Sequence, residues 1–318
     1  MTFRAHVRCG ALTGAVVLLT ALAPLRAQDL TWSSSIGYAG GSYVFDDQLH
    51  TFSWLNSLWW RLQRINLTAS LPVVAQNGTA ISLVGGVPVP TGGPDAGAVQ
   101  RRQSGQSIRL RPGRRTTSGS GGNGRIAGSW SLAADVSMDT LIDSLSVAGT
   151  GAYEVNVGDP MFGGTLTTYQ GNGVVRSFDV GAWAKAPIAS VESGVGTGAW
   201  DYAGGASLAL GVAQTLLFAD ATWWVLGDMP DLKLKDALFY SVGIGQPLGS
   251  DWSLLGSVSA STRVSETVDA PLAVGLSLSR GLARRASFSV GASVGITESA
   301  SSVSAYVAWS TKLFGGTD

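Results

Sequence analysis

The sequence predicts an all-β protein: a transmembrane antiparallel up-and-down β-barrel of about 12 strands with one long extracellular insertion. Large apolar residues alternate with small or polar ones in segment after segment, and a period of two is typical of strands. The small side of the alternation is mostly Gly, Ser and Ala, and short links alternate with longer ones along the chain. Segments of about ten residues, joined by short turns on one side and long loops on the other, are typical of outer-membrane barrels.

The first 27 residues predict a secretory signal peptide. Arginines precede the apolar run GALTGAVVLLTALAPL, and Leu25-Arg26-Ala27 offers a cleavage site before Gln28,. The run is shorter than the roughly 20 apolar residues that a membrane helix needs. Cleavage would remove the only cysteine, Cys9, so that neither disulfides nor a cysteine metal site could form in residues 28–318, the expected barrel,.

Each expected strand shows the same two-sided pattern. Near the N-terminus, RINLTASLPV sets Ile65 and Leu67 against Asn66 and Thr68, and ASFSVGASVGI near the C-terminus sets large residues against Ser and Gly. In order, we expect strands near 30–39, 49–60, 65–74, 160–169, 177–187, 199–210, 215–226, 237–246, 252–262, 272–280, 286–296 and 302–314. The last one ends at Phe314, off the apolar parity, so either the strand shifts register there or the aromatic end signal is imperfect.

Two soluble folds compete with the barrel. A β-sandwich also alternates, but it hides its apolar face behind a second sheet of comparably bulky residues. Here Gly alone supplies 43 residues, and the small face needs no partner sheet. A β-solenoid would show a fixed repeat length, and we find none. The large side chains therefore face lipid and the small ones a lumen.

Aromatic residues gather where the expected strands end. Such residues form girdles at the two lipid–water interfaces of membrane barrels. One group lies at the end of a hairpin whose tight turn is GVAQ, and the other group lies at the opposite end of the barrel. The expected girdle residues are Trp200, Tyr202, Trp223 and Trp224 in the first group, and Trp32, Trp59, Trp60 and Trp252 in the second.

The long connection, residues 75–159, is expected to be an extracellular loop insertion. Its first part is rich in Gly, Ser and Arg and lacks the apolar content to fold alone, which favours a solvated outer loop. Alternatively it forms an electropositive cap that contacts lipopolysaccharide phosphates or attracts anionic solutes. Residues 130–159 are candidates for a constriction in the mouth. The arginines are Arg101, Arg102, Arg109, Arg111, Arg114, Arg115 and Arg125.

Several motifs follow one another between about residues 30 and 314, namely RLQRINLTASLPVV, NVGDP, AKAP, GTGAWDY and LGDMPDLKLKD. Their order resembles that of a bacterial family of outer-membrane transporters named after the MetA pathway of phenol degradation. The resemblance implies a barrel and the passage of small molecules, aromatic ones among them, and it assigns no catalytic residue. Ile188-Ala189 departs from the family's Thr-Gly, and the insertion is much longer. The family's motif would correspond to Lys185, Pro187, Gly196, Thr197, Gly198 and Asp201.

The sequence contains few residues of the kinds that bind metals or catalyse reactions. His50 is the single histidine after the signal peptide, so a Cys/His zinc site is excluded by count,. A lipid hydrolase would need a serine beside that histidine on the outer wall, and His50 fits better as a polar residue at a strand end. We therefore expect no enzyme activity, no cofactor, no metal and no nucleic-acid partner.

The favoured function is an outer-membrane channel or facilitator for passive passage of small solutes, because small inward side chains keep the bore open. Few fixed charges face the lumen, which predicts weak ion discrimination and uncharged or amphipathic solutes. The alternative is a structural or assembly barrel with a sealed lumen and partner-binding loops. Expected partners are outer-membrane lipid and lipopolysaccharide, the barrel insertion machinery and a small-molecule solute, with the protein multi-pass in the bacterial outer membrane.

The candidate solute-contact residues are four charged residues on the lumen parity of consecutive strands, Asp179, Lys185, Asp201 and Asp220. A symmetric loop over 187–199 puts Lys185 opposite Asp201, close enough for an ion pair. The same reasoning at GVAQ puts Asp220 beside Gly205. The pair could merely neutralise charge in a partly desolvated bore. A pair near the outer mouth with an unpartnered Asp below it would instead favour cations or hydroxyl-bearing solutes.

Overall fold

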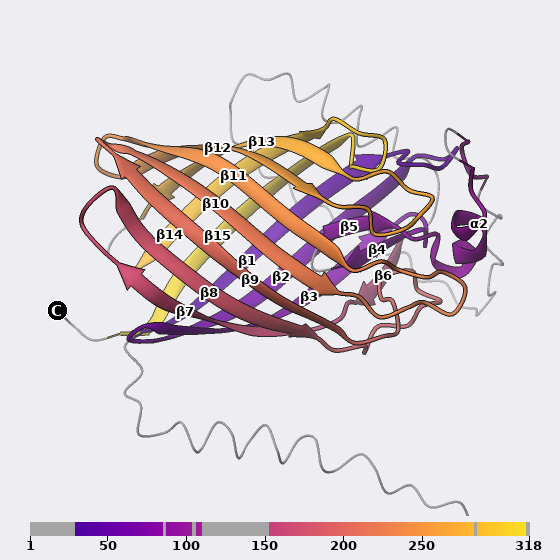
Figure 1. Ribbon diagram of the computed structural model, residues 1–318, viewed down its shortest axis with the longest axis horizontal. Helices are drawn as coiled ribbons and strands as arrows, with labels where there is room; N and C mark the ends of the chain where they lie inside the picture. Colours follow the sequence, from indigo (N-terminus) through magenta and orange to yellow (C-terminus); the bar gives the residue numbers. More distant parts are fainter. Residues whose placement is uncertain (1–28, 85–86, 104–105, 110–152, 283–284, 316–318) are drawn as a thin grey trace, which may run out of the picture.

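The structure, a computed structural model, describes residues 29–84, 87–103, 106–109, 153–282 and 285–315. Its main sheet has thirteen strands, and pairing of β2 with both β1 and β3 closes twelve of them into an antiparallel barrel (Figure 1). The predicted fold class is confirmed. The barrel strands are β1 (Asp29–Gly41), β2 (Leu49–Leu62), β3 (Ile65–Gln76), β7 (Met161–Gln170), β8 (Val175–Lys185), β9 (Asp201–Val212), β10 (Thr215–Val225), β11 (Ala237–Leu248), β12 (Trp252–Ser261), β13 (Leu272–Gly281), β14 (Ala286–Gly295) and β15 (Val303–Gly315).

The thirteenth strand, β6 (Glu154–Val157), continues the line of β7. β3 pairs with β7 through its first half and with β6 through residues 73–76. Gly158, Asp159 and Pro160 separate the two short strands, and the Gly158 N–H donates to the Pro72 carbonyl at 2.8 Å. Hydrogen bonding to β3 therefore continues across this break, although β6 and β7 are separate strands.

The two faces of each strand differ as the alternation predicts. On β13, Leu276 is 59% exposed on the outer face, while Gly275 and Ser277 lie on the opposite parity. Gly275 is registered with Ser257 on β12 and Ser293 on β14, so small residues of neighbouring strands share the inner face. Within the described residues, no helix is both long and apolar enough to cross a membrane.

The two ends of the barrel are unequal. Short turns such as residues 213–214 and 249–251 join strands at one end, called the tight-turn end below. Loops 42–48, 186–200, 226–236 and 262–271 project from the other, the long-loop end. The last strand carries a bulge near its C-terminus, since the register with β1 shifts between Leu30↔Phe314 and Thr31↔Lys312. A register shift therefore accounts for the position of Phe314.

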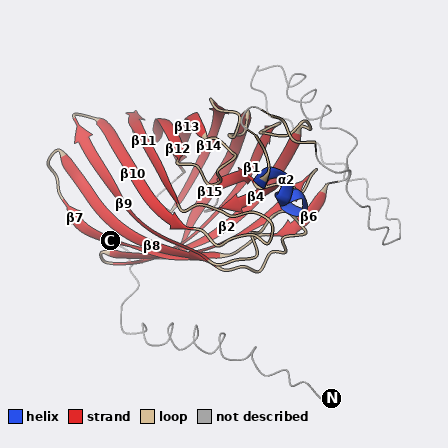
Figure 2. Cartoon of the chain, turned by 45° about the vertical axis from the view of Figure 1, so that its right-hand side comes forward, coloured by secondary structure: helices blue, strands red, loops and turns tan. Residues whose placement is uncertain are grey.

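Part of the long insertion folds across the long-loop end. Residues 77–109, called the cap segment below, contain the hairpin β4 (Ile81–Val84) and β5 (Val87–Pro90), the 3-10 helix η1 (Gly93–Asp95) and the short helix α2 (Ala96–Gln100). Figure 1 shows β4, β5 and α2, and Figure 2 shows β4 and α2, at the end of the barrel where the long loops gather.

The cap segment shares a hydrophobic core with the loops around it, and this corrects the expectation of a solvated loop over its length. Its Ile81, Val84 and Val99 are at most 2% exposed and pack with residues from three other loops. The segment is too poor in apolar residues to fold by itself, but the neighbouring loops supply the missing partners. Those partners include Tyr43, Val44, Phe45, Met229, Leu232, Val264 and Val268.

Candidate functional site: a chamber beneath the cap

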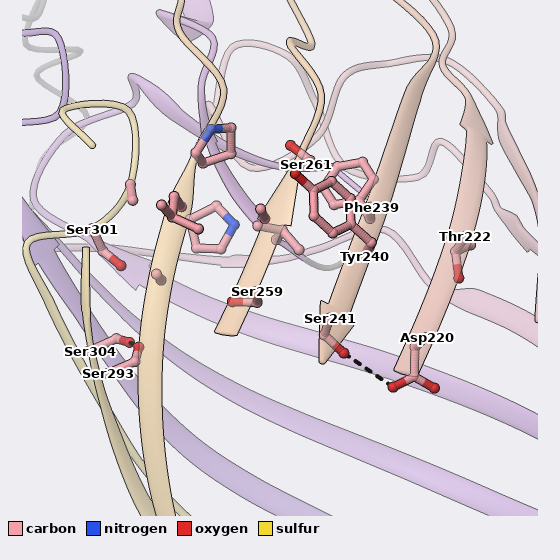
Figure 3. A pocket seen from close by; sticks show the side chains of 17 residues that line it. Asp220, Thr222, Phe239, Tyr240, Ser241, Ser259, Ser261, Ser293, Ser301 and Ser304 are labelled. Carbon is pink, nitrogen blue, oxygen red and sulfur yellow. Dashed lines mark hydrogen bonds between the residues drawn. The ribbon is translucent and has the colours of Figure 1, made fainter. Parts of the chain in front are cut away.

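A cavity of about 350 Å³ lies inside the barrel against the cap hairpin. Val87 and Pro88 of β5 line it from the cap, and Phe239 and Asp220 line it from the wall. Ser241 Oγ donates a hydrogen bond to Asp220 Oδ2 at 3.1 Å, as Figure 3 shows. The cavity is of a size that suits a small organic molecule. Its other serine and threonine hydroxyl groups belong to Thr222, Ser259, Ser261, Ser293, Ser301 and Ser304.

A second cavity, of about 270 Å³, lies on the side of β1, β2 and β3. It shares Pro88, Ser301 and Ser304 with the first one, so Pro88 of β5 lies between them. Tyr306 and Lys185 line its wall. Together the two cavities form a chamber beneath the cap, lined by hydroxyl groups and small apolar surfaces.

Lys185 lies at the edge of the second cavity, at the centre of a buried cluster. Its Nζ donates to Asp159 Oδ2 at 3.0 Å and to Thr197 Oγ1 at 2.8 Å, and it lies 2.8 Å from Asp201 Oδ2. Lys185 is directly opposite Asp201 in the register, so that predicted pairing is confirmed. The Lys185 and Asp201 side chains have the inner parity, but they are only 3% and 0% exposed, so neighbouring residues cover the pair.

The cluster fastens two loops and the strand break. Asp159, in the break between β6 and β7, accepts the backbone N–H groups of Ile188 and Ala189 through Oδ1 at 2.8 and 2.7 Å. Asp201 Oδ1 accepts the N–H of Gly227 at 2.9 Å. Three buried charges are tolerable only when they are paired and hydrogen bonded. Here each charged group is paired and forms at least one hydrogen bond, although Asp201 Oδ2 itself is held by the ion pair alone.

The loop fastened by this cluster in turn holds the cap hairpin. Ser82 Oγ donates to the Gly194 carbonyl at 2.8 Å, and the Leu83 N–H donates to the Val195 carbonyl at 3.1 Å. Neither Asp159 nor Thr197 is among the four candidate solute-contact residues, although Thr197 belongs to the family's motif. The motifs NVGDP and GTGAWDY contain them, and this is the signal that could have identified both.

The other two candidate carboxylates lie deeper, on the inner face. Asp179 is registered with Ser207, and so is Asp220, from the other side of β9. The predicted pairing of Asp220 with Gly205 is therefore wrong by two residues. Thr222 is the residue that pairs with Gly205. All four candidates remain proposals as solute contacts.

The arginines of the insertion have different surroundings. Arg102 is buried, and it donates to the carbonyls of Gln106 at 2.5 Å and Thr267 at 2.8 Å, with Glu298 3.7 Å away. It therefore ties the cap segment to two loops. Arg109 is exposed and lies 3.9 Å from Asp46. Arg101 is exposed as well, and Arg111, Arg114, Arg115 and Arg125 lie outside the described residues, as does most of 130–159.

The predicted girdle residues divide between the two faces. Trp223 and Tyr202 are about half exposed on the outer face near the long-loop end, with Trp200 stacked on Tyr202. Trp224, the next residue after Trp223, points the other way and joins the cap core at 5% exposed. Near the tight-turn end, Trp59 donates to Ser33 Oγ on the inner parity, whereas Trp32, Trp60 and Trp252 have the outer parity.

His50 lies on β2 with Tyr38 beside it. Tyr38 Oη and His50 Nδ1 are 2.8 Å apart, and the rings stack. Among the described residues no serine hydroxyl is hydrogen bonded to His50, and no group of three potential metal ligands occurs there. This geometry offers no serine–histidine pair for hydrolysis.

Comparison with known proteins relates the chain to outer-membrane barrels by structure. No family model and no curated protein sequence matches it. An outer-membrane channel from Pseudomonas putida F1 aligns with a TM-score of 0.53 and 8% identity, over 91% of this chain and 97% of that one. The KdgM porin aligns at 0.44 with 7% identity, covering 89% and 99%. The P. putida toluene transporter TodX aligns at 0.42 with 12% identity, covering 92% and 91%. The first alignment supports a shared barrel fold, and we base no argument on the other two.

Proposed function

We propose that the protein is an outer-membrane channel or facilitator for the passive passage of small solutes, aromatic or amphipathic in character. The observation that carries this proposal is the chamber beneath the cap. It lies inside a closed barrel whose inner face is mostly Gly, Ser and Ala, and it combines hydroxyl groups with the apolar surfaces of Phe239 and Val87. Such a mixture suits solutes with both polar and apolar parts.

The bacterial outer membrane is the location that suits this fold. Lipid tails and lipopolysaccharide would contact the apolar outer face, and the barrel insertion machinery would assemble it there. The resemblance to the transporter family of the MetA pathway agrees with a channel for small molecules, and it belongs to the same proposal.

A second function, a sealed structural barrel whose loops bind partners, is favoured by one observation. The cap segment is packed firmly against the long-loop end, because its apolar side chains are buried in a core with loops from the rest of the barrel. A cap held in this way would close the long-loop end unless it moves.

Planar-bilayer conductance and liposome solute uptake by the full chain distinguish the two functions. The matched control is a shortened chain in which an Asn-Gly turn replaces residues 77–153. Gln76 and Glu154 are directly opposite in the register, so a two-residue turn can join them as a hairpin. Conductance by the full chain supports a channel. If the shortened barrel conducts while the full chain neither conducts nor admits solute, the sealed barrel is the better description.

A further inference from the structure

One row of the inner wall carries two carboxylates. Successive register pairs link Thr167 on β7, Asp179 on β8, Ser207 on β9, Asp220 on β10 and Ser241 on β11. The two aspartates are thus separated by one strand, which puts their backbones about 10 Å apart. The space between them is occupied at the wall only by the small side chain of Ser207.

Each carboxylate accepts a hydrogen bond from the neighbouring strand that lies away from β9. Thr167 Oγ1 donates to Asp179 Oδ1 at 2.5 Å, and Ser241 Oγ donates to Asp220 Oδ2 at 3.1 Å. In the described part of the chain, these are the hydrogen bonds that the two carboxylates accept, so each keeps its second oxygen available. A hollow of about 160 Å³ lies between them, lined by Asp179, Asp220, Ser207 and the Trp183 ring.

Among the described residues, no basic side chain forms an ion pair with Asp179 or Asp220. Lys185, farther along β8, is already shared between Asp159 and Asp201. Near the tight-turn end, Lys312 and Arg61 lie 2.8 and 3.9 Å from Asp29. Arg176 is also near that end and donates to the Asn172 carbonyl. The continuation of the row beyond Ser241 is Ser259, Ala273 and Gly295, none of which is charged. At the other end of the row, the Thr167 N–H donates at 2.8 Å to the carbonyl of Arg64, whose side chain is exposed in the turn between β2 and β3.

The same row borders the chamber. Asp220 and Thr222 line both the hollow and the larger cavity beneath the cap, so a solute in the chamber lies beside a carboxylate. Rings of acidic side chains are one way in which pores select cations, and a wall of low dielectric strengthens the field of such charges. The face of a tryptophan ring attracts cations as well.

We infer that Asp179 and Asp220 set the charge selectivity of the lumen and that the solutes it favours are small cations, including amphipathic ones that carry an ammonium group. The inference rests on the proposed channel function. It assigns selectivity to this row and gives the buried Lys185–Asp201 pair a structural role. It also replaces the weak ion discrimination that a count of fixed charges suggests.

The test is the reversal potential of the full chain in a tenfold KCl gradient at low ionic strength, where exposed charges act over the longest range. Wild type should prefer K⁺ over Cl⁻. Each of Asp179→Asn and Asp220→Asn should lower the cation-to-anion permeability ratio by about fivefold, since a unit charge about 8 Å away in a watery bore favours one ion sign and disfavours the other. The ratio should also fall toward one in 1 M salt.

Three controls separate the possible failures. The double variant Asp179→Glu with Asp220→Glu keeps both charges and should keep the preference for K⁺ over Cl⁻. Asp231→Asn removes one negative charge from an exposed loop and should leave that preference unchanged. The benzylammonium cation in place of K⁺ tests the organic class. A current without cation preference, or a preference that survives in the double asparagine variant, overturns the inference alone. Absence of any current in the full chain contradicts the channel itself.

Discussion

Lys185 connects more of the molecule than any local pattern suggests. Its three oxygen partners come from the break before β7, from the loop after β8 and from the start of β9. That loop then holds the cap hairpin through the carbonyls of Gly194 and Val195. A single ammonium group thus links the wall to the cap in two steps.

Replacing Lys185 by Met should destabilise the barrel by about 3–5 kcal/mol, because two buried carboxylates would be left without their cation. Loss of the heat-resistant folded band on semi-native gels, at lower temperature than for wild type, measures the change. Lys235→Met is the matched control, since Lys235 forms an exposed pair with Glu266 at 3.2 Å, and such pairs contribute at most about 1 kcal/mol. Equal melting of the two variants would contradict the role given to the cluster.

Tyr43 gives the cap a predicted pH dependence. Burial in the loop 42–48 raises the pKa of Tyr43 to about 12, whereas the unfolded chain ionises near 10. Stability from this group is therefore fully present below pH 10 and is lost as pH rises through 12, by up to about 2.7 kcal/mol. Proteolysis of the cap by an alkali-tolerant protease should accelerate between pH 10 and 12. Tyr43→Phe keeps the ring in the core, and a rate that rises equally in this variant would exclude Tyr43 as the cause.

At the level of elements, the sequence predicted the barrel strands and did not predict the cap. Alternation is a local property, so segments such as 286–296 could be located within a residue or two of β14. The hairpin β4–β5 consists of four-residue strands with two prolines in VPVP, too short to show a period. Its core partners, Met229 and Val264 among them, lie far away in the sequence. Only the folded chain brings them together.

The contact between the cap and the loop after β8 depends on glycine. Gly194 has φ +73°, and a Cβ there would lie 2.1 Å from the Thr79 carbonyl oxygen. Gly194→Ala should therefore push the start of the cap segment outward, making residues 77–109 sensitive to added protease and raising conductance. Gly249→Ala is the control, because Gly249 has φ +79° but a Cβ added there would have open space for 4 Å around it. The Gly249→Ala variant introduces similar backbone strain in a tight turn. If both variants release the cap, the clash with Thr79 is not the cause.

For the whole molecule, closure was predictable and the face of most strand residues was too, although Trp59 and Trp224 lie on the inner face rather than in the girdles. Exact register was predictable only in part. Lys185 and Asp201 are opposite each other because the loop between them closes symmetrically. The error at Asp220 has a physical cause in the next hairpin. Val212 still pairs with Thr215, so the turn is two residues long and Ala213 takes φ +53°. A positive φ at alanine is uncommon, and the sequence GVAQ gives no sign of it.

The completed barrel and its cap differ in what stabilises them, and they should therefore open separately. Each barrel strand is hydrogen bonded on both sides around a closed ring, and in lipid an opened strand would leave backbone groups without partners. The described part of the cap segment has few backbone hydrogen bonds to the rest of the chain, and it is stabilised mainly by burial of apolar side chains. Urea weakens this hydrophobic stabilisation.

Hydrogen exchange of the vesicle-inserted protein in increasing urea should therefore show peptides from residues 77–103, 227–236 and 263–269 losing protection together. Peptides from β9 to β14 should stay protected at the same urea concentration. In the shortened chain with the Asn-Gly turn, peptides from 227–236 and 263–269 should exchange rapidly without urea, since their core partners Ile81, Val84 and Val99 are gone. Simultaneous loss of protection in cap and strands would mean that the cap core is continuous with the wall, and that passage through the long-loop end requires unfolding of the barrel itself.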